Sequence, residues 1–301
     1  FMAGTGLEGQ GNTQAGCSVA AALENADSAD NAAVVEIANA INASASPADS
    51  LSSASGLAAQ ASVLGAAQGG EALTGAALGR VAALGGDAAG AYSGVSSGVS
   101  SGDVIEARKG DQSLWIQGVG GFGDIDSDAR AQGSDYDLYG VVAGMDVRIE
   151  HEGQGVPDST LGMFVGYSLS QSDVKGLNDG ADVDAYLAGL YGRARLLPQT
   201  YLSGALSGAW LNFDTARDSG AGIASADFSG AGAFAQAELL YDLQADGYWV
   251  SPFIGVEGSY IHHEDYRESG AGVLNMNAQS EATAQLRTII GVQHNSAHSL
   301  E

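Results

Sequence analysis

The stretch Tyr139-Gly-Val-Val-Ala-Gly-Met-Asp-Val-Arg-Ile149 decides the fold of this chain. Apolar residues recur at every second position from Tyr139 to Ile149, and Gly, Asp and Arg fill most of the positions between them. Successive side chains of a strand point to opposite faces, so this alternation predicts a strand with one apolar face and one face of small or polar residues.

The same alternation continues through most of the chain. We expect eight long strands, over residues 113–126, 135–149, 160–174, 182–196, 200–217, 225–244, 248–266 and 279–295. They run to roughly 14–20 residues, against about 5–6 for a usual strand. Short turns alternate with longer acidic loops between them. The pattern predicts an all-β fold, an antiparallel transmembrane β-barrel, closed because hydrocarbon does not tolerate an open sheet edge.

Composition excludes several other classes of protein. Lys and Arg number 11 against 36 Asp and Glu, and a net charge of −25 argues against a nucleic-acid partner. No apolar run approaches the roughly 18 residues of a membrane helix. Cys17 is the one cysteine, which excludes an internal disulfide and Cys-based zinc sites. We expect neither a metal nor a cofactor.

The chain upstream of the strands has a different character. Residues 1–84 form an Ala-rich helical linker region, in which Val34, Ile37, Ala38 and Ile41 follow helical spacing. Further helix is expected near residues 57–64, with a last helix over 73–84. Such narrow apolar stripes need a partner to be stable. Residues 85–110 form a Gly/Ser-rich flexible connector, and residues 111–301 form the barrel domain.

Two glycine motifs suggest nucleotide or hydrolase chemistry. Residues 118–123 match G-x-G-x-x-G, but an acidic stretch follows them where a phosphate site needs a helix start. Residues 94–102 match G-x-S-x-G twice, inside low-complexity sequence rather than between a strand and a helix. Small residues on the barrel wall and a flexible spacer are the favoured interpretations.

Two further clusters contain metal-ligand residue types. Asp124, Asp126 and Asp128 begin like a calcium loop, but the loop's glycine is missing, so a solvated loop is favoured over weak calcium binding. His262 and His263 are adjacent and point to opposite faces of a strand, which disfavours a shared metal.

Charged residues on the less apolar strand face are the main candidates for a functional site. If the apolar face meets lipid, these charges face the lumen, since they are costly in lipid. They are Asp146, Arg148, Arg193, Glu238, Glu257 and Arg287. One hypothesis is a wetted pore lining. The other is that Glu238, Glu257 and Arg287 contact a helix in the lumen, with Arg80 as the partner of the two glutamates.

Aromatic residues near the strand ends match the girdles that outer-membrane barrels place at both membrane interfaces. The candidates are Trp115, Tyr139, Tyr201, Trp210, Tyr248, Trp249 and Tyr260.

Several stretches resemble the C-terminal translocator domain of monomeric autotransporters, type V secretion proteins. They are Ser113-Leu-Trp-Ile-Gln-Gly-Val-Gly-Gly-Phe-Gly-Asp124, Asp135-Tyr-Asp-Leu-Tyr-Gly-Val-Val-Ala-Gly-Met-Asp146, Asp184-Ala-Tyr-Leu-Ala-Gly-Leu-Tyr-Gly192 and Ser251-Pro-Phe-Ile-Gly-Val256. The resemblance implies a twelve-stranded barrel in the outer membrane of a Gram-negative cell, with a helix leading through its lumen to an N-terminal passenger. It also implies insertion by the barrel-assembly machinery and help from periplasmic chaperones.

Eight strands are visible of the twelve that the resemblance implies, and the sequence closes on Ala297-His-Ser-Leu-Glu301 without an aromatic residue. We therefore expect a barrel domain truncated at its C-terminus, by analogy with the family. The chain also starts at Phe1 without a leader, as an internal or C-terminal piece of a longer protein would.

The leading hypothesis is a non-enzymatic outer-membrane translocator that anchors an autotransporter and conducts its passenger to the cell surface. The alternative is a Gly-rich soluble or surface-attached β-protein that acts as an adhesin, and its strands would need polar exteriors. A hydrolase is the third hypothesis, and Cys17 has no histidine before His151 as a partner.

Overall fold

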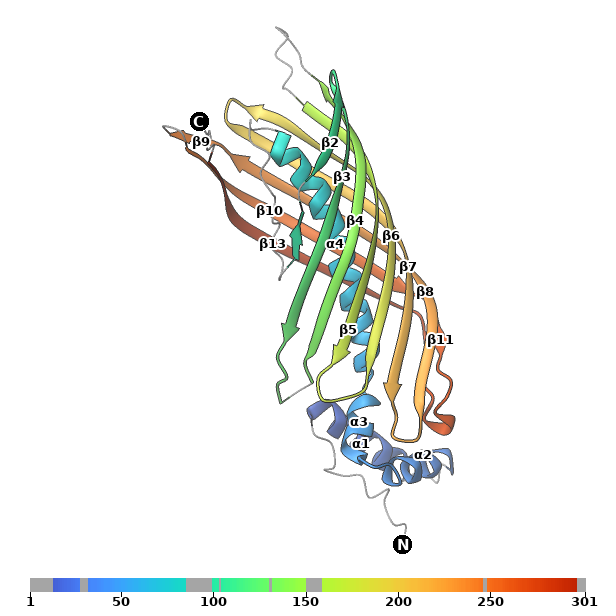
Figure 1. The fold of residues 1–301 in the computed structure, drawn as a ribbon. Helices are drawn as coiled ribbons and strands as arrows, with labels where there is room; N and C mark the ends of the chain where they lie inside the picture. The colour runs from blue at the N-terminus through green and yellow to red at the C-terminus, as the bar shows by residue number, and fades with distance from the viewer. Residues whose placement is uncertain are drawn as a thin grey trace.

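A computed structural model describes residues 13–27, 32–84, 99–102, 104–129, 132–149, 159–245 and 248–296. Four helices come first, and an antiparallel sheet follows them. The helices are α1 (Gln14–Asp27), α2 (Ala32–Asn42), α3 (Pro47–Ser53) and α4 (Leu57–Leu84). Figure 1 shows α4 lying along the sheet and α1, α2 and α3 gathered at one end of it.

Eight long strands dominate the sheet. They are β3 (Gln112–Ile125), β4 (Ser134–Ile149), β5 (Ser159–Val174), β6 (Gly180–Leu197), β7 (Thr200–Asp218), β8 (Ile223–Tyr241), β10 (Tyr248–His263) and β13 (Glu281–Ser296). Each pairs antiparallel with the next in chain order. The expected strands agree with these bounds to within a few residues, and the predicted fold class is confirmed.

Five shorter strands complete the β-structure. β1 (Val99–Ser101), β2 (Ile105–Lys109) and β9 (Leu243–Ala245) belong to the large sheet, whereas β11 (Tyr266–Arg267) and β12 (Asn277–Ala278) pair separately. β1 and β2 both pair with β3. They lie inside the range expected to be a flexible connector, so its last part is ordered on the edge of the sheet. Residues 85–98 lie outside the described residues.

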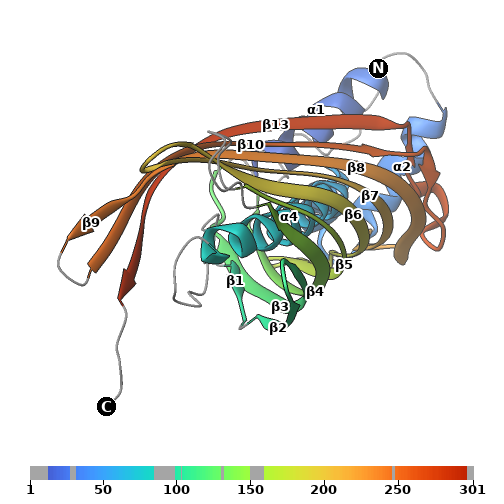
Figure 2. The same cartoon turned by 90° about the horizontal axis from the view of Figure 1, so that it is seen from above.

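The sheet curls around α4, as the view from above shows (Figure 2). β3 and β13 stand at the two ends of the series, and within the described ranges no pairing joins them directly. α4 packs against strands from β3 to β10. The strands therefore surround the helix on most of its circumference.

Strand register separates an outer apolar face from an inner face. One row of directly paired outer residues crosses all eight long strands. It consists of Leu114, Met145, Met163, Leu190, Leu206, Ala235, Gly258 and Leu286. Its large side chains are 48–80% exposed, and a continuous exposed apolar band of this kind marks a contact surface for a membrane or a partner. The inner face is buried against α4 from β3 to β10, whereas the inner face of β13 is largely exposed.

Local sequence explains the helix ends. The Thr13 hydroxyl accepts a hydrogen bond from the Gly16 amide at the start of α1. Pro47 opens α3, where its missing N–H costs nothing. Gly56 follows α3 with φ +83°, which favours glycine, and α4 starts at the next residue.

α4 is one continuous helix of 28 residues, whereas the sequence predicts two shorter pieces. Gly69-Gly70 in its middle weakens an isolated helix, and burial inside the sheet compensates for this weakness. None of the described helices, α4 included, has the length and hydropathy of a bilayer-crossing helix.

Leu190→Arg tests the outer face. An arginine near the bilayer midplane should lower the free energy of unfolding by about 2–4 kcal/mol, because the charge loses hydration. The measurement is urea unfolding in lipid vesicles, followed by tryptophan emission. The control is Asp182→Arg, on the same face of β6 near the loop end, where the cost should be about 0–1 kcal/mol. Equal losses for the two variants would contradict the membrane orientation.

Candidate functional site

The candidate site is the space on the concave side of the sheet, which α4 fills. Small residues let the helix backbone approach the strands closely. A Cβ at Gly65 would lie 2.8 Å from the Ser170 Oγ, and a Cβ at Gly69 would lie 2.6 Å from the Ser168 Oγ. A Cβ at Gly70 would overlap the Phe234 ring. The glycines are therefore part of the fit between helix and sheet.

α4 contains two charged residues among its 28, Glu71 and Arg80, and both contact opposite charges on strands. Glu71 lies 2.5 Å from the Arg287 guanidinium of β13 and accepts a hydrogen bond of 2.9 Å from the Ser259 hydroxyl of β10. Arg287 also pairs with Glu257, its direct neighbour across β10 and β13. One arginine thus bridges a carboxylate of the helix and a carboxylate of the wall.

Arg80 forms the second polar cluster. Its Nε lies 3.2 Å from the Asp146 carboxylate of β4, and its Nη1 lies 2.9 Å from the Glu106 carboxylate of β2. The Tyr191 hydroxyl donates to the same Asp146 oxygen at 3.0 Å and accepts from the Trp115 indole at 2.5 Å. Tyr191 and Asp146 therefore connect Arg80 to the aromatic wall of the sheet.

Arg193 of β6 lies at the C-terminal end of α4. Its Nη1 donates to the Val81 carbonyl at 3.1 Å, one of the last four carbonyls of the helix, which have no intrahelical partner. A cation is also favoured there by the helix dipole. The guanidinium lies 3.9 Å from the Tyr201 ring centroid, and Glu238 and Asp242 add negative charge nearby.

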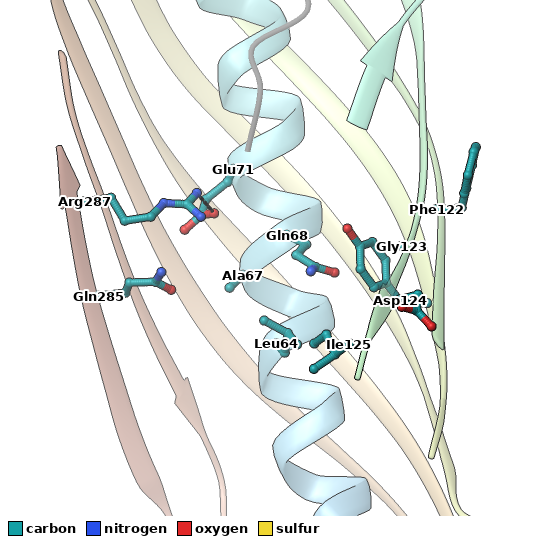
Figure 3. Close-up of a pocket in the computed structure, with 11 residues that line it drawn as sticks. Leu64, Ala67, Gln68, Glu71, Phe122, Gly123, Asp124, Ile125, Gln285 and Arg287 are labelled. Carbon is teal, nitrogen blue, oxygen red and sulfur yellow. Dashed lines mark hydrogen bonds and ion pairs between the residues drawn. The ribbon is translucent and has the colours of Figure 1, made fainter. Parts of the chain in front are cut away.

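A cavity of about 420 Å³ opens where β3 and β13 face each other across α4 (Figure 3). Leu64, Gln68 and Glu71 line its helix side. In Figure 3, Arg287 reaches across from β13 to meet Glu71, whereas Phe122 of β3 points away from the helix. This is the side on which the sheet leaves α4 uncovered.

The structure places all the predicted lumen residues on the inner face. Arg80, Asp146, Arg193, Glu238 and Glu257 are buried, Arg287 is partly exposed, and Arg148 is half-buried beside Arg108 and Asp146. Arg80 differs from the expectation, since it pairs with Asp146 and Glu106 rather than with the two glutamates.

Sequence reasoning missed Glu71, Glu106 and Tyr191. The signal for Glu71 was available, because it is the one acidic residue in a helix otherwise composed mainly of Ala, Gly and Leu.

The aromatic candidates separate into two groups. Tyr139, Trp210 and Tyr260 lie on the outer face, 49–57% exposed. Tyr201 has the same strand parity as the buried Ser203, and its ring contacts Arg193, so it lies on the inner face rather than with the outer aromatics. The girdle assignment of Trp115 is wrong. Its side chain is 1% exposed and faces inward, because Leu114 and Ile116 on either side of it take the outer face. The side chains of Tyr248 and Trp249 lie outside the described residues.

The candidate metal ligands have other contacts. The Lys175 ammonium lies among Asp124, Asp126 and Asp135 and forms ion pairs with these carboxylates. His263 packs against Phe228 and Tyr266. In the described part of the chain, no three His, Cys, Asp or Glu residues are arranged to hold a metal.

Comparisons with known proteins agree with this geometry. The family model described as "Autotransporter beta-domain" matches residues 114–301. An extracellular serine protease from Serratia marcescens is 26% identical over 184 residues, 60% of this chain and 17% of that protein. The chain thus spans about a sixth of this curated relative. The translocator domain of the autotransporter NalP from Neisseria meningitidis has the same fold, with a TM-score of 0.57 at 14% identity, over 81% of this chain and 74% of that one.

Gly70→Val tests the fit between helix and sheet. The new side chain would overlap Phe234 and displace α4, so trypsin should cleave after the otherwise buried Arg80 much faster. Adding Phe234→Ala should restore protection. Gly75→Ala is the matched control, because its Cβ would meet only the Gln236 Oε1 at 3.5 Å. Unchanged protection in Gly70→Val would contradict this seating of the helix.

A double-mutant cycle tests the ion pair between α4 and the wall. Glu71→Gln and Arg287→Gln should each lower the urea midpoint, with a coupling energy of about 0.5–3 kcal/mol. Arg287→Gln leaves Glu71 without its cation, and Glu71→Gln leaves Arg287 bound to the wall through Glu257 alone, with no tie to the helix. Gln285→Ala, in the same cavity without an ion pair, is the control. Additive losses would show that the contact does not hold the helix.

Proposed function

Because the chain belongs to the autotransporter β-domain family, whose members are outer-membrane translocators that export a passenger domain, we propose that α4 occupies the path that the passenger has taken. A single observation carries the proposal: α4 lies inside the curled sheet, and both of its charged residues pair with the wall. The helix is then the segment that is retained in the channel as a plug after the passenger has left.

The direction of α4 supports this assignment. Its N-terminal end lies beside the longer loops of the sheet, such as residues 264–280 between β10 and β13. Its C-terminal end lies at the end of the sheet that has two-residue turns, such as residues 110–111 between β2 and β3 and residues 198–199 between β6 and β7. Outer-membrane barrels place long loops outside the cell and short turns in the periplasm. Residues before α4 therefore lie on the external side, together with the passenger.

The inner wall suits passage of many different sequences. Ser168, Ser170, Ser203 and Ser207 bring small hydroxyl groups to the face against α4. Such groups can hydrogen-bond to any passing backbone without selecting a side chain. The mechanism is insertion, enclosure and conduction of an unfolded chain. The family is not itself catalytic, and we assign no reaction to this chain.

The remaining assignments extend the proposal. Residues 1–84 are the linker to the passenger, 85–110 connect it to the barrel domain, and 111–301 form that domain. The exposed apolar outer face contacts outer-membrane lipids. Family membership favours insertion by the barrel-assembly machinery and passage of the unfolded chain with periplasmic chaperones.

A reporter passenger fused before Thr13 tests conduction. The enclosed space holds one helix, about 10–12 Å across, whereas a folded domain of about 100 residues has a radius of gyration near 13 Å. A reporter carrying an engineered disulfide should therefore reach the surface of intact cells only when reduced. The measurement is protease accessibility on whole cells, with the cysteine-free reporter as control. Equal surface exposure of the reduced and oxidised reporters would contradict passage through this space.

A further inference from the structure

Helices α1, α2 and α3 lie outside the curled sheet, across the end at which α4 begins (Figure 1). They pack on one another and on the sheet through a cluster of buried apolar residues. Helix residues Ala20, Ala38, Ile41 and Leu51 meet Ala224 of β8 and Ala271 and Leu274 of the 264–280 loop. This cluster is separate from the core around α4.

Three other connections of the sheet also contact these helices. The Gln14 amide of α1 donates to the Ala129 carbonyl in the β3–β4 loop at 3.0 Å. Gly220, in the β7–β8 turn with φ +78°, lies so close to Ser50 of α3 that a Cβ there would overlap its Oγ.

In the β5–β6 loop, Asp179 lies beside these helices. It is 2% exposed and accepts a hydrogen bond of 2.8 Å from the Asp218 amide. Burial raises the pKa of its carboxyl, and the nearby Ser53 hydroxyl of α3 opposes this shift. The helices therefore exclude water from this loop, and every described loop at this end is in contact with them.

The 264–280 loop is held in a fixed shape under α2. Arg217 of β7 binds the Glu268 carboxylate through two hydrogen bonds of 2.8 and 2.6 Å, and also donates to the Leu274 carbonyl. The Met276 amide donates to the same carboxylate at 2.7 Å. This buried arginine fixes Leu274 in the apolar cluster, and so prepares a surface for α2.

The connection to the channel helix is short. Three residues, 54–56, join α3 to α4, and Gly56 supplies a left-handed backbone conformation at this junction. Movement of α4 toward the periplasm would therefore pull α3 into a space that holds one helix. Because α1, α2 and α3 are packed on one another, they would have to enter this space together, and three helices side by side do not fit there.

We propose that α1, α2 and α3 form an exit latch, which docks on the four loops, closes the outer mouth of the channel and keeps α4 at its depth. The inference rests on the proposed function. Its interaction surface is the loop end of the sheet, and its partner is the segment of the same chain that directly precedes α4.

Two variants open the latch from opposite sides. Ile41→Asp places a charge in the apolar cluster from the helix side, and Gly220→Val blocks Ser50 from the sheet side. Val35→Asp is the matched control, since Val35 lies on the same helix as Ile41 but is 43% exposed. All variants are made in the full-length protein with the surface reporter, in a Cys17→Ser, Ser50→Cys background.

Three measurements on intact cells decide the outcome. Both opening variants should make the thiol introduced by Ser50→Cys react with a membrane-impermeant maleimide and increase entry of a large glycopeptide antibiotic at least several-fold, while Val35→Asp changes neither. Reporter display should be unchanged in all of them. Labelling without antibiotic entry would overturn the latch and leave the proposed function intact. Antibiotic entry without labelling would also overturn it. Loss of display in every strain, including the unaltered protein, would instead refute the proposed function.

Discussion

An outer-membrane strand must bond its backbone amides and carbonyls to neighbouring strands, because hydrocarbon offers them no other partner. The rest of the structure depends on this constraint. It requires long strands in continuous register, which β3 to β13 provide along nearly their whole lengths, with one register shift between Arg195 and Leu197 at the end of β6. It also requires strict alternation, since a slip of one residue would turn every apolar side chain inward. The outer row from Leu114 to Leu286 records that register across all eight strands.

A curled sheet of this kind encloses a space, and a helix is well suited to fill it. The backbone groups of α4 form hydrogen bonds within the helix, so the wall has to provide only a complementary shape and opposite charges. Shape explains Gly65, Gly69 and Gly70, each opposite a wall side chain. Opposite charge explains why Glu71 pairs with Arg287 and why Arg80 pairs with Asp146. Removing one partner of such a pair leaves a costly buried charge, so these contacts fix how deeply the helix sits.

Much of this was predictable from the sequence, because period-2 alternation over long segments reports directly on a sheet between lipid and lumen. The inner charges follow from the same parity. Trp115 was assigned wrongly because residue type was weighed before parity: Leu114 and Ile116 already occupied the outer face. The partner of Arg80 could not be predicted, since it depends on which wall residues lie at the same level as Arg80 along the axis of α4. Nine residues separate Glu71 from Arg80, about 13 Å along the helix, and strand tilt decides which wall residues lie at each level.

The contacts inside and outside the channel differ in what they can resist. Arg287 is partly exposed at the open side of the sheet, and a hydrated ion pair contributes modestly to stability. This pair selects one depth for α4 but opposes a steady pull weakly, and the buried pair of Arg80 with Asp146 is the stronger of the two contacts. The apolar cluster around Ile41 and Leu274 is dry, and α3 follows α4 after only three residues. The ion pairs thus define the depth of the helix, and the packed helices outside prevent it from leaving that depth.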